Sequence, residues 1–236
     1  MSFIGSIALA EPISYSEPII TFDVDWAHDE VLFDLYSLVK SDDIQTTWMI
    51  THKSDFLKVL EKCSKCEIGI HPNFNFLLSG DSRLGKTAEE VVSRMMNLVP
   101  SSKVVRSHSV CQSSRISQLF WESGIRYESN DYIPASEILA LKPWHIEIGI
   151  TKVPYFFSDE LACIKQTPSI PVLCDRLGLK VFDFHPIHVF LNTESLDRYE
   201  KTRSLHQNPK ELIKYRYEGY GTRTRLIELM ELCKKL

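Results

Sequence analysis

The sequence predicts a single α/β domain, a distorted or incomplete (β/α) barrel of about seven parallel strands with a helical C-terminal segment. Three observations lead to this expectation. Short apolar runs alternate with amphipathic helical patterns, which is typical of parallel sheets with right-handed crossovers. A length of 236 residues suits one large domain. Seven strand candidates favour a barrel over an open sheet.

The elements follow in order along the chain. Residues 1–18 are expected to form an N-terminal strap, and residues 19–236 the domain itself. We place strands at residues 19–25, 46–51, 66–71, 103–108, 126–130, 147–157 and 179–185. We expect helices near residues 29–41, 54–63, 87–99, 113–123 and 170–177, and from about residue 194 onwards. Capping patterns at Thr87, which lies three residues before Glu90, and at Ser113 support two of these helix starts.

Composition excludes several classes of protein. The formal net charge of −4, with 25% charged residues, argues against a nucleic-acid-binding protein. No apolar run reaches the roughly 20 residues that span a bilayer. The N-terminus lacks the basic segment of a signal peptide, so we expect a cytoplasmic location. The one C-x-x-C pair, Cys63 and Cys66, has no second pair at zinc-ribbon spacing and is interpreted as structural.

Polar side chains cluster where four predicted strands end. The segments are IITFDVDW (19–26), CEIGIHPNFN (66–75), KVVRSHS (103–109) and LKVFDFHPIH (179–188). In parallel α/β folds the carboxyl ends of the strands converge on one crevice, where the loops carry the chemistry. The residues expected to meet there are Asp23, Asp25, His71, Arg106, His108, His185 and His188.

The acidic pair points to a cation. Asp23 and Asp25 are two residues apart on one predicted strand, so their carboxylates should leave the same face. Two carboxylates held this close repel each other unless a cation neutralises one of them. A divalent metal ion would do so and leave the other carboxylate as a base. The alternative is a pair of strand-end aspartates that cap the next helix.

The four motifs together resemble the polysaccharide deacetylases, the NodB-homology domains of carbohydrate esterase family 4. TFDVD is similar to the first motif of that family, HPNFN lies where it has two metal-binding histidines, VRSHS lies where it has an arginine, and FDFHPIH is similar to its last motif. FDVDWA, GIHPNFN, RSHS and FHPIHVFLNT are especially similar to the WbmS-like branch, which is associated with surface-polysaccharide biosynthesis such as that of the lipopolysaccharide O-antigen. The resemblance implies a deacetylase-like catalytic domain over residues 19–236.

Roles follow from the resemblance by position. It implies Asp23 as catalytic base, Arg106 as its partner and His185 as general acid, with Asp25 and His71 as ligands of one divalent metal ion. Zinc is the first expectation for that ion, and other transition metals are alternatives.

The third metal ligand is a departure from the family. Asn75 occupies the position of the second family histidine. An amide oxygen is a weaker zinc ligand than imidazole, so His108 is the alternative third ligand.

The implied reaction is metal-assisted hydrolysis of an N-acyl group, acetyl or formyl, on an amino sugar or sugar precursor. Substrate contacts are expected at Trp26, Asn73, Phe157, Asp159 and His188, and Asp159 is also expected to fix Arg106 or His185. The sequence does not specify whether the carbohydrate is free, nucleotide-linked or lipid-linked, nor the oligomeric state.

Two other functions compete with this one. Residues Gly80–Thr87 fit the phosphate-loop pattern G-x-x-x-x-G-K-[ST], which would indicate a nucleotide-binding enzyme. However, Glu89 and Glu90 would occupy the first helical turn, where a bound phosphate needs free N–H groups. A non-catalytic carbohydrate-binding relative is the second alternative, with Asn75 as the sign of a degraded metal site.

Overall fold

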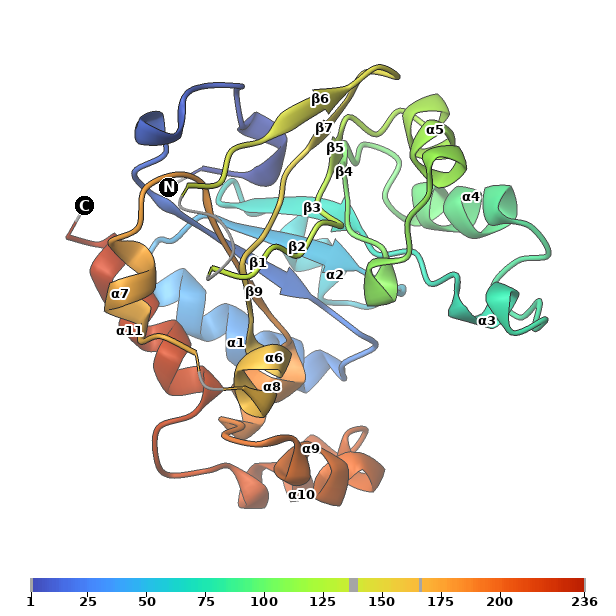
Figure 1. Ribbon diagram of the computed structural model, residues 1–236. Coiled ribbons are helices and arrows are strands. Elements are labelled where there is room, and N and C mark those ends of the chain that lie inside the picture. The colour runs from blue at the N-terminus through green and yellow to red at the C-terminus, as the bar shows by residue number, and fades with distance from the viewer. Residues whose placement is uncertain (1, 136–139, 166, 236) are drawn as a thin grey trace.

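The computed structural model of the chain describes residues 2–135, 140–165 and 167–235. It is built around one nine-stranded sheet, with α4 and α5 at one end and α7 and α11 at the other (Figure 1). The strands are β1 (Pro18–Asp23), β2 (Thr46–Ile50), β3 (Cys66–Ile70), β4 (Val104–Val105), β5 (Tyr127–Glu128), β6 (Trp144–Ile146), β7 (Ile150–Lys152), β8 (Phe157–Ser158) and β9 (Lys180–Phe184).

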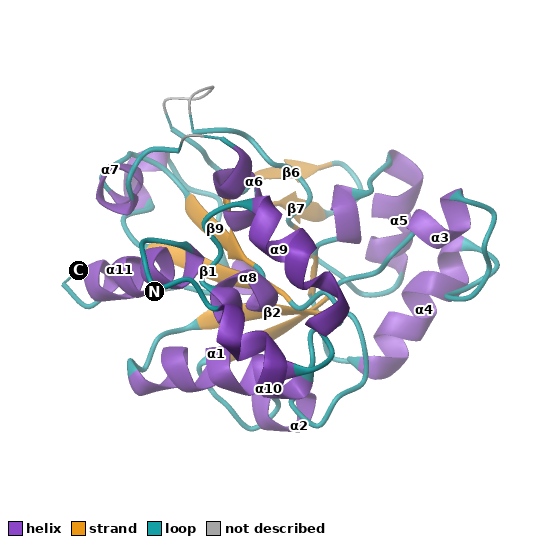
Figure 2. Ribbon diagram, turned by 90° about the horizontal axis from the view of Figure 1, so that it is seen from below, coloured by secondary structure: helices purple, strands orange, loops and turns teal. Residues whose placement is uncertain are grey.

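Eleven α-helices surround this sheet within the described residues (Figure 2). They are α1 (Asp29–Ser41), α2 (Leu57–Leu60), α3 (Asn75–Leu78), α4 (Ala88–Leu98), α5 (Ser114–Glu122), α6 (Asp159–Ile164), α7 (Ile170–Cys174), α8 (Pro186–Leu191), α9 (Leu196–Thr202), α10 (Pro209–Leu212) and α11 (Thr222–Cys233). Short 3-10 helices are η1 (Ile4–Ser6), η2 (Pro12–Ser14), η3 (His108–Val110), η4 (Arg203–Leu205) and η5 (Ile213–Tyr215).

The sheet confirms the predicted α/β class. Its strand order is β6-β7-β5-β4-β3-β2-β1-β9-β8, and every neighbouring pair except β6–β7 is parallel. Residues 147–157, where one strand interrupted by Pro154 is predicted, contain β7 and the start of β8, two separate strands on either side of that proline. An antiparallel strand, β6, was not predicted; it returns into β7 through Gly149, which has the positive φ of 90° that glycine tolerates.

The segment between β7 and β8 draws the two ends of the sheet together. Val153 N donates to Glu128 O at 2.8 Å, and Tyr155 N donates to Asp131 O at 3.0 Å. One residue later, Phe156 N donates to Val181 O in β9 at 3.4 Å. A single extended stretch therefore bonds to β5 at its start and to β9 at its end, which gives the sheet its incomplete-barrel form.

The core is apolar on both faces of the central strands, as expected for a parallel sheet covered by helices. Every residue of β1, β2 and β9 is buried. Phe22 and Trp48 pack with ring centroids 4.5 Å apart, and Trp48 also contacts Phe56 at the start of α2. These strands hold the site residues at their carboxyl ends in a rigid frame.

The N-terminal residues lie against the sheet. Ile4 and Ile7 are buried, Ile4 N donates to Thr47 Oγ1, and Gly5 N donates to the Glu67 carboxylate at 2.9 Å. No helix among the described residues is both long and apolar enough to cross a membrane.

The segment from Gly80 to Thr87 does not form a phosphate loop. Helix α3, and not a strand, comes before it. Thr87 instead caps α4 by accepting a hydrogen bond from Glu90 N, and the Glu90 carboxylate accepts from Lys86 N at 2.8 Å. A carboxylate and a hydroxyl of the chain itself thus accept from backbone donors that a phosphate would need.

Candidate metal and catalytic centre

The predicted residues converge on one cleft of about 360 Å³ at the carboxyl ends of β1, β3 and β9 and beside η3. Its lining includes Asp23, Asp25, His71, His108 and His185. Residues separated by more than 150 positions in the sequence therefore share one site, as parallel strand topology predicts.

The turn after β1 differs from the predicted geometry. β1 ends at Asp23, and Asp25 and Trp26 have left-handed backbone conformations with φ of 44° and 55°. Such φ values are uncommon for residues other than glycine; each costs about 1–3 kcal/mol and persists only where the surroundings enforce it. Trp26 N donates to Thr51 Oγ1 and Trp26 O accepts from Gln207 Nε2, both at 3.1 Å. Asp25 thus reaches the cleft from a strained turn and not from the same strand face as Asp23.

Asp25 lies at the centre of the candidate metal site. Its Oδ1 is 3.2 Å from His71 Nε2 and 3.0 Å from His108 Nδ1, and one donor atom from each of the three residues lies within 4.8 Å of the others. Burial would raise the pKa of Asp25, but hydrogen bonds from His108 and His71 outweigh burial and hold it well below its usual range. Despite burial, Asp23 and Asp25 raise the pKa of His71.

This donor set fits a divalent ion. Two imidazoles and one carboxylate suit zinc and other borderline transition metals. His71 Nδ1 is buried without a hydrogen-bond partner among the described residues, so the polar contacts of this ring are made through Nε2, on the side of the two aspartates. Two carboxylates facing one imidazole nitrogen form an electronegative pocket that a cation would neutralise.

Of the two alternative third ligands, His108 lies with Asp25 and His71 in the cleft, and Asn75 is not among the described residues that line it. Asn75 begins α3, and its Nδ2 donates to Ser109 Oγ at 2.9 Å. Its contact supports the loop that carries His108. That loop also departs from the predicted strand, because β4 ends at Val105 and Ser109 has a φ of 55°.

Arg106 is fully buried, and the side chain binds other buried residues. Its Nη1 donates to Asp23 Oδ1 at 3.0 Å, to Thr21 Oγ1 and to Asp183, while Nε and Nη2 bind Ser129. One guanidinium thus holds two buried carboxylates. Burial raises the pKa of Asp183 to about 7, although the charge of Arg106 opposes this shift.

Asp23 has one oxygen committed and one available. Oδ1 accepts from Arg106, while Oδ2 faces His71 Nε2 at 3.8 Å on the cleft side. The carboxylate is therefore oriented by its partner and open towards the cleft.

His185 is held by Asp159. The Asp159 carboxylate, fully buried, accepts from His185 N at 2.8 Å and lies 2.7 Å from His185 Nδ1, which leaves Nε2 facing Asp25 Oδ2 at 3.6 Å. Burial would lower the pKa of His185, but the charge and hydrogen bond of Asp159 outweigh it and raise the pKa well above its usual value. Asp159 thus contacts His185, and Arg106 has other partners.

The residues predicted to bind substrate take different places. Trp26 lines the cleft and forms a T-shaped contact with His108, with ring centroids 5.1 Å apart. His188 also lines it; its ring packs on Tyr199 at 4.9 Å, and burial lowers its pKa to about 4. Asn73 is buried and accepts from Asn75 N.

Phe157 differs from its predicted role. It packs in the core against Phe182 and Phe184, with ring centroids 5.4 and 5.3 Å away, because its strand β8 pairs with β9. It does not belong to the cleft lining.

Sequence reasoning missed several residues of the centre. Asp183 interrupts an apolar strand, and a charged residue inside such a run was the signal that could have found it. Glu160 and Tyr199 line the cleft from α6 and α9. No sequence motif near these residues predicts that the two helices lie at the site.

Comparison with known proteins agrees with this geometry. The family model of WbmS-like polysaccharide deacetylases matches residues 20–203, which contain every residue of the centre described above. The chain belongs to the WbmS-like polysaccharide deacetylase family. Family membership makes it a hydrolase, and the predicted resemblance is confirmed.

Solved structures support the assignment. The chain is 36% identical to WbmS of Bordetella bronchiseptica, whose crystal structure is described as that of a polysaccharide deacetylase involved in O-antigen biosynthesis; the match has a TM-score of 0.88 and covers 98% of this chain and 97% of that one. A Mycobacterium smegmatis protein described as a polysaccharide deacetylase is 14% identical, with a TM-score of 0.50 and coverage of 97% and 94%; this likeness concerns the fold alone. None of the curated proteins matches the chain.

Proposed function

We propose that this WbmS-like chain is a metal-dependent amide hydrolase that removes an acetyl or formyl group from an amino sugar during surface-polysaccharide biosynthesis. The observation that carries this proposal is the convergence of three prepared units on one cleft. They are the Asp23–Arg106 pair, the Asp25–His71–His108 donor set and the His185–Asp159 pair.

A divalent ion held by Asp25, His71 and His108 would act as a Lewis acid that polarises the acyl carbonyl and lowers the pKa of water. Asp23, oriented by Arg106, accepts the proton of the attacking water through Oδ2. His185 donates the proton on Nε2 to the departing nitrogen as the C–N bond breaks, and Asp159 stabilises its imidazolium form. With these two proton transfers, the amide and one water are converted into a carboxylic acid and a free amine.

The cleft also indicates which part of the substrate it receives. Trp26 and Tyr199 present aromatic surface that suits a sugar ring, and Glu160 and Glu200 add negative charge. Among the residues that the structure describes, no lysine or arginine lines this cleft. We therefore assign the cleft to the sugar itself, with the phosphates of any nucleotide or lipid carrier outside it. The role in O-antigen biosynthesis rests on the description of the Bordetella relative.

The test is release of acetate or formate from N-acylated amino-sugar oligosaccharides by protein that has been stripped of metal and reloaded with zinc. We expect turnover only with metal, and its loss in Asp23→Asn. Saccharide binding without any turnover in the reloaded protein would favour the non-catalytic alternative.

A further inference from the structure

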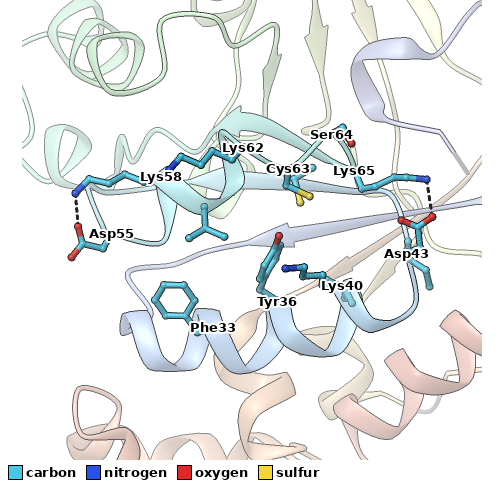
Figure 3. Close-up of a pocket in the computed structure, with 14 residues that line it drawn as sticks. Phe33, Tyr36, Lys40, Asp43, Asp55, Lys58, Lys62, Cys63, Ser64 and Lys65 are labelled. Atoms are coloured by element: carbon cyan, nitrogen blue, oxygen red, sulfur yellow. Dashed lines mark hydrogen bonds and ion pairs between the residues drawn. The ribbon is translucent and has the colours of Figure 1, made fainter.

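A second hollow lies outside the catalytic cleft. A groove of about 760 Å³ separates α1 from α2 and the turn that leads into β3 (Figure 3). Tyr36 extends from α1 towards Cys63 across this groove, and the Lys40 side chain lies beside Tyr36. Cys66 begins β3 and His71 follows its other end, so the length of a five-residue strand, roughly 16 Å, separates the groove from the metal site.

The groove holds the C-x-x-C pair of the chain. Cys66 N donates to Cys63 O at 3.1 Å, which closes a tight turn over the two intervening residues. Such a turn keeps its first and fourth Cα atoms within about 7 Å, near the range of about 4.4–6.8 Å found in disulfides. Both cysteines are partly exposed and free, and each shifts the pKa of the other. The pair is therefore close enough to be joined and accessible to a small molecule.

The surroundings of the pair are basic. Four lysines and two aspartates line the groove. Lys58 pairs with Asp55 at 2.7 Å and Lys65 with Asp43 at 3.0 Å, as the dashed lines in Figure 3 show.

The other two lysines, Lys40 and Lys62, are not paired with an acidic side chain within the described part of the chain. Both line the groove that holds Cys63, and the charge of Lys40 acts on that thiol, so the groove favours anionic reagents over cationic ones.

The two thiols are not equivalent. Burial would raise the pKa of Cys63, but hydrogen bonds from the Cys66 thiol and the Tyr36 hydroxyl outweigh it and lower that pKa. Burial and the neighbouring Cys63 raise the pKa of Cys66 to about 12. A thiolate is the nucleophile in thiol–disulfide exchange, so the cysteine with the lower pKa, Cys63, is expected to attack first.

We propose that Cys63 and Cys66 form a dithiol site that reacts with small anionic disulfides, with Cys63 as the attacking and Cys66 as the resolving thiol. The Cys63 thiolate attacks one sulfur of the disulfide, whose S–S bond breaks and releases the first thiolate. Cys66 then loses its proton and attacks Cys63 Sγ, which releases the second thiol and leaves an intramolecular disulfide. Two electrons pass from the protein to the small disulfide, which becomes two thiols.

The experiment treats the reduced full chain with oxidised glutathione, which is anionic, or cystamine, which is cationic, at equal concentration and low salt. We expect wild type to form the Cys63–Cys66 disulfide by peptide mapping, at a rate at least about tenfold higher with glutathione disulfide than with cystamine. High salt should reduce this ratio, and so should the double variant K40Q/K62Q, whereas Lys214→Gln, which is not part of the groove lining, should not.

Single cysteine variants test the order of attack. Cys66→Ser should accumulate one glutathione on Cys63, Cys63→Ser should lose the fast phase, and Cys174→Ser should react like wild type. The proposal is overturned if wild type forms no Cys63–Cys66 disulfide, if Cys63→Ser reacts as fast as wild type, or if the charge of the reagent makes no difference. Peptide mapping of the wild-type protein tests whether the Cys63–Cys66 disulfide forms and needs no variant.

Discussion

Asp159→Asn should uncouple His185 from its role as proton donor. The carboxylate lies 2.7 Å from His185 Nδ1 and also accepts from the backbone N of the same residue. An asparagine can present its oxygen to only one of these donors, and its amide group carries no charge to stabilise an imidazolium. We therefore expect the pKa of His185 to fall, because only the charges of Asp183 and Asp25 then oppose the effect of burial.

The size of this fall follows from the contact that is lost. A hydrogen bond to a charged group contributes about 1.5–3 kcal/mol, and one pKa unit corresponds to about 1.4 kcal/mol. The pKa of His185 should thus move down by about one to two units. His185 can donate a proton only below its pKa, so activity falls as the pH rises through that value. In Asp159→Asn this fall should begin at a lower pH than in wild type.

The measurement is the pH dependence of kcat/KM for acyl release with zinc-loaded protein. We expect the alkaline limb of the profile to move down in Asp159→Asn and to stay in place in Glu160→Gln, a change at the next position of the same helix. The reasoning is refuted if the limb of Asp159→Asn coincides with that of wild type while the fold is intact.

Three further outcomes follow from the same geometry. Arg106→Lys should lower the free energy of unfolding by about 3–5 kcal/mol in urea, because one ammonium cannot satisfy two buried carboxylates; an unchanged midpoint would contradict this. His108→Ala should lose zinc in a metal analysis, whereas Asn75→Ala should keep it. The reverse pattern would identify Asn75 as the third ligand. Phe157→Ala should cost about 3–5 kcal/mol of stability in the same urea assay, and a loss of substrate affinity at full stability would return Phe157 to the cleft.

Strand-end motifs made much of the site predictable. Each of the four segments ends an apolar run, and parallel topology alone brings the ends of such runs together. Asp25 and His71, 46 positions apart, accordingly lie 3.2 Å from each other.

What the sequence could not show depends on turns and tertiary packing. The left-handed conformation of Trp26 is enforced by Thr51 and Gln207, which lie far from it in the chain. The period of a strand therefore predicted the wrong face for Asp25. Phe157 was predicted to contact the substrate, but the pairing of its strand with β9 places it in the core.

The proposed activity depends on one divalent ion that Asp25, His71 and His108 bind together. Titration of zinc into metal-free protein, followed by calorimetry, tests this without reference to activity. Wild type and Glu160→Gln should bind one equivalent, and Asp25→Ala and His71→Ala should each lose more than the roughly 10–100-fold in affinity that changes outside the ligand set cause. Binding of wild-type strength by both folded alanine variants would contradict the central claim.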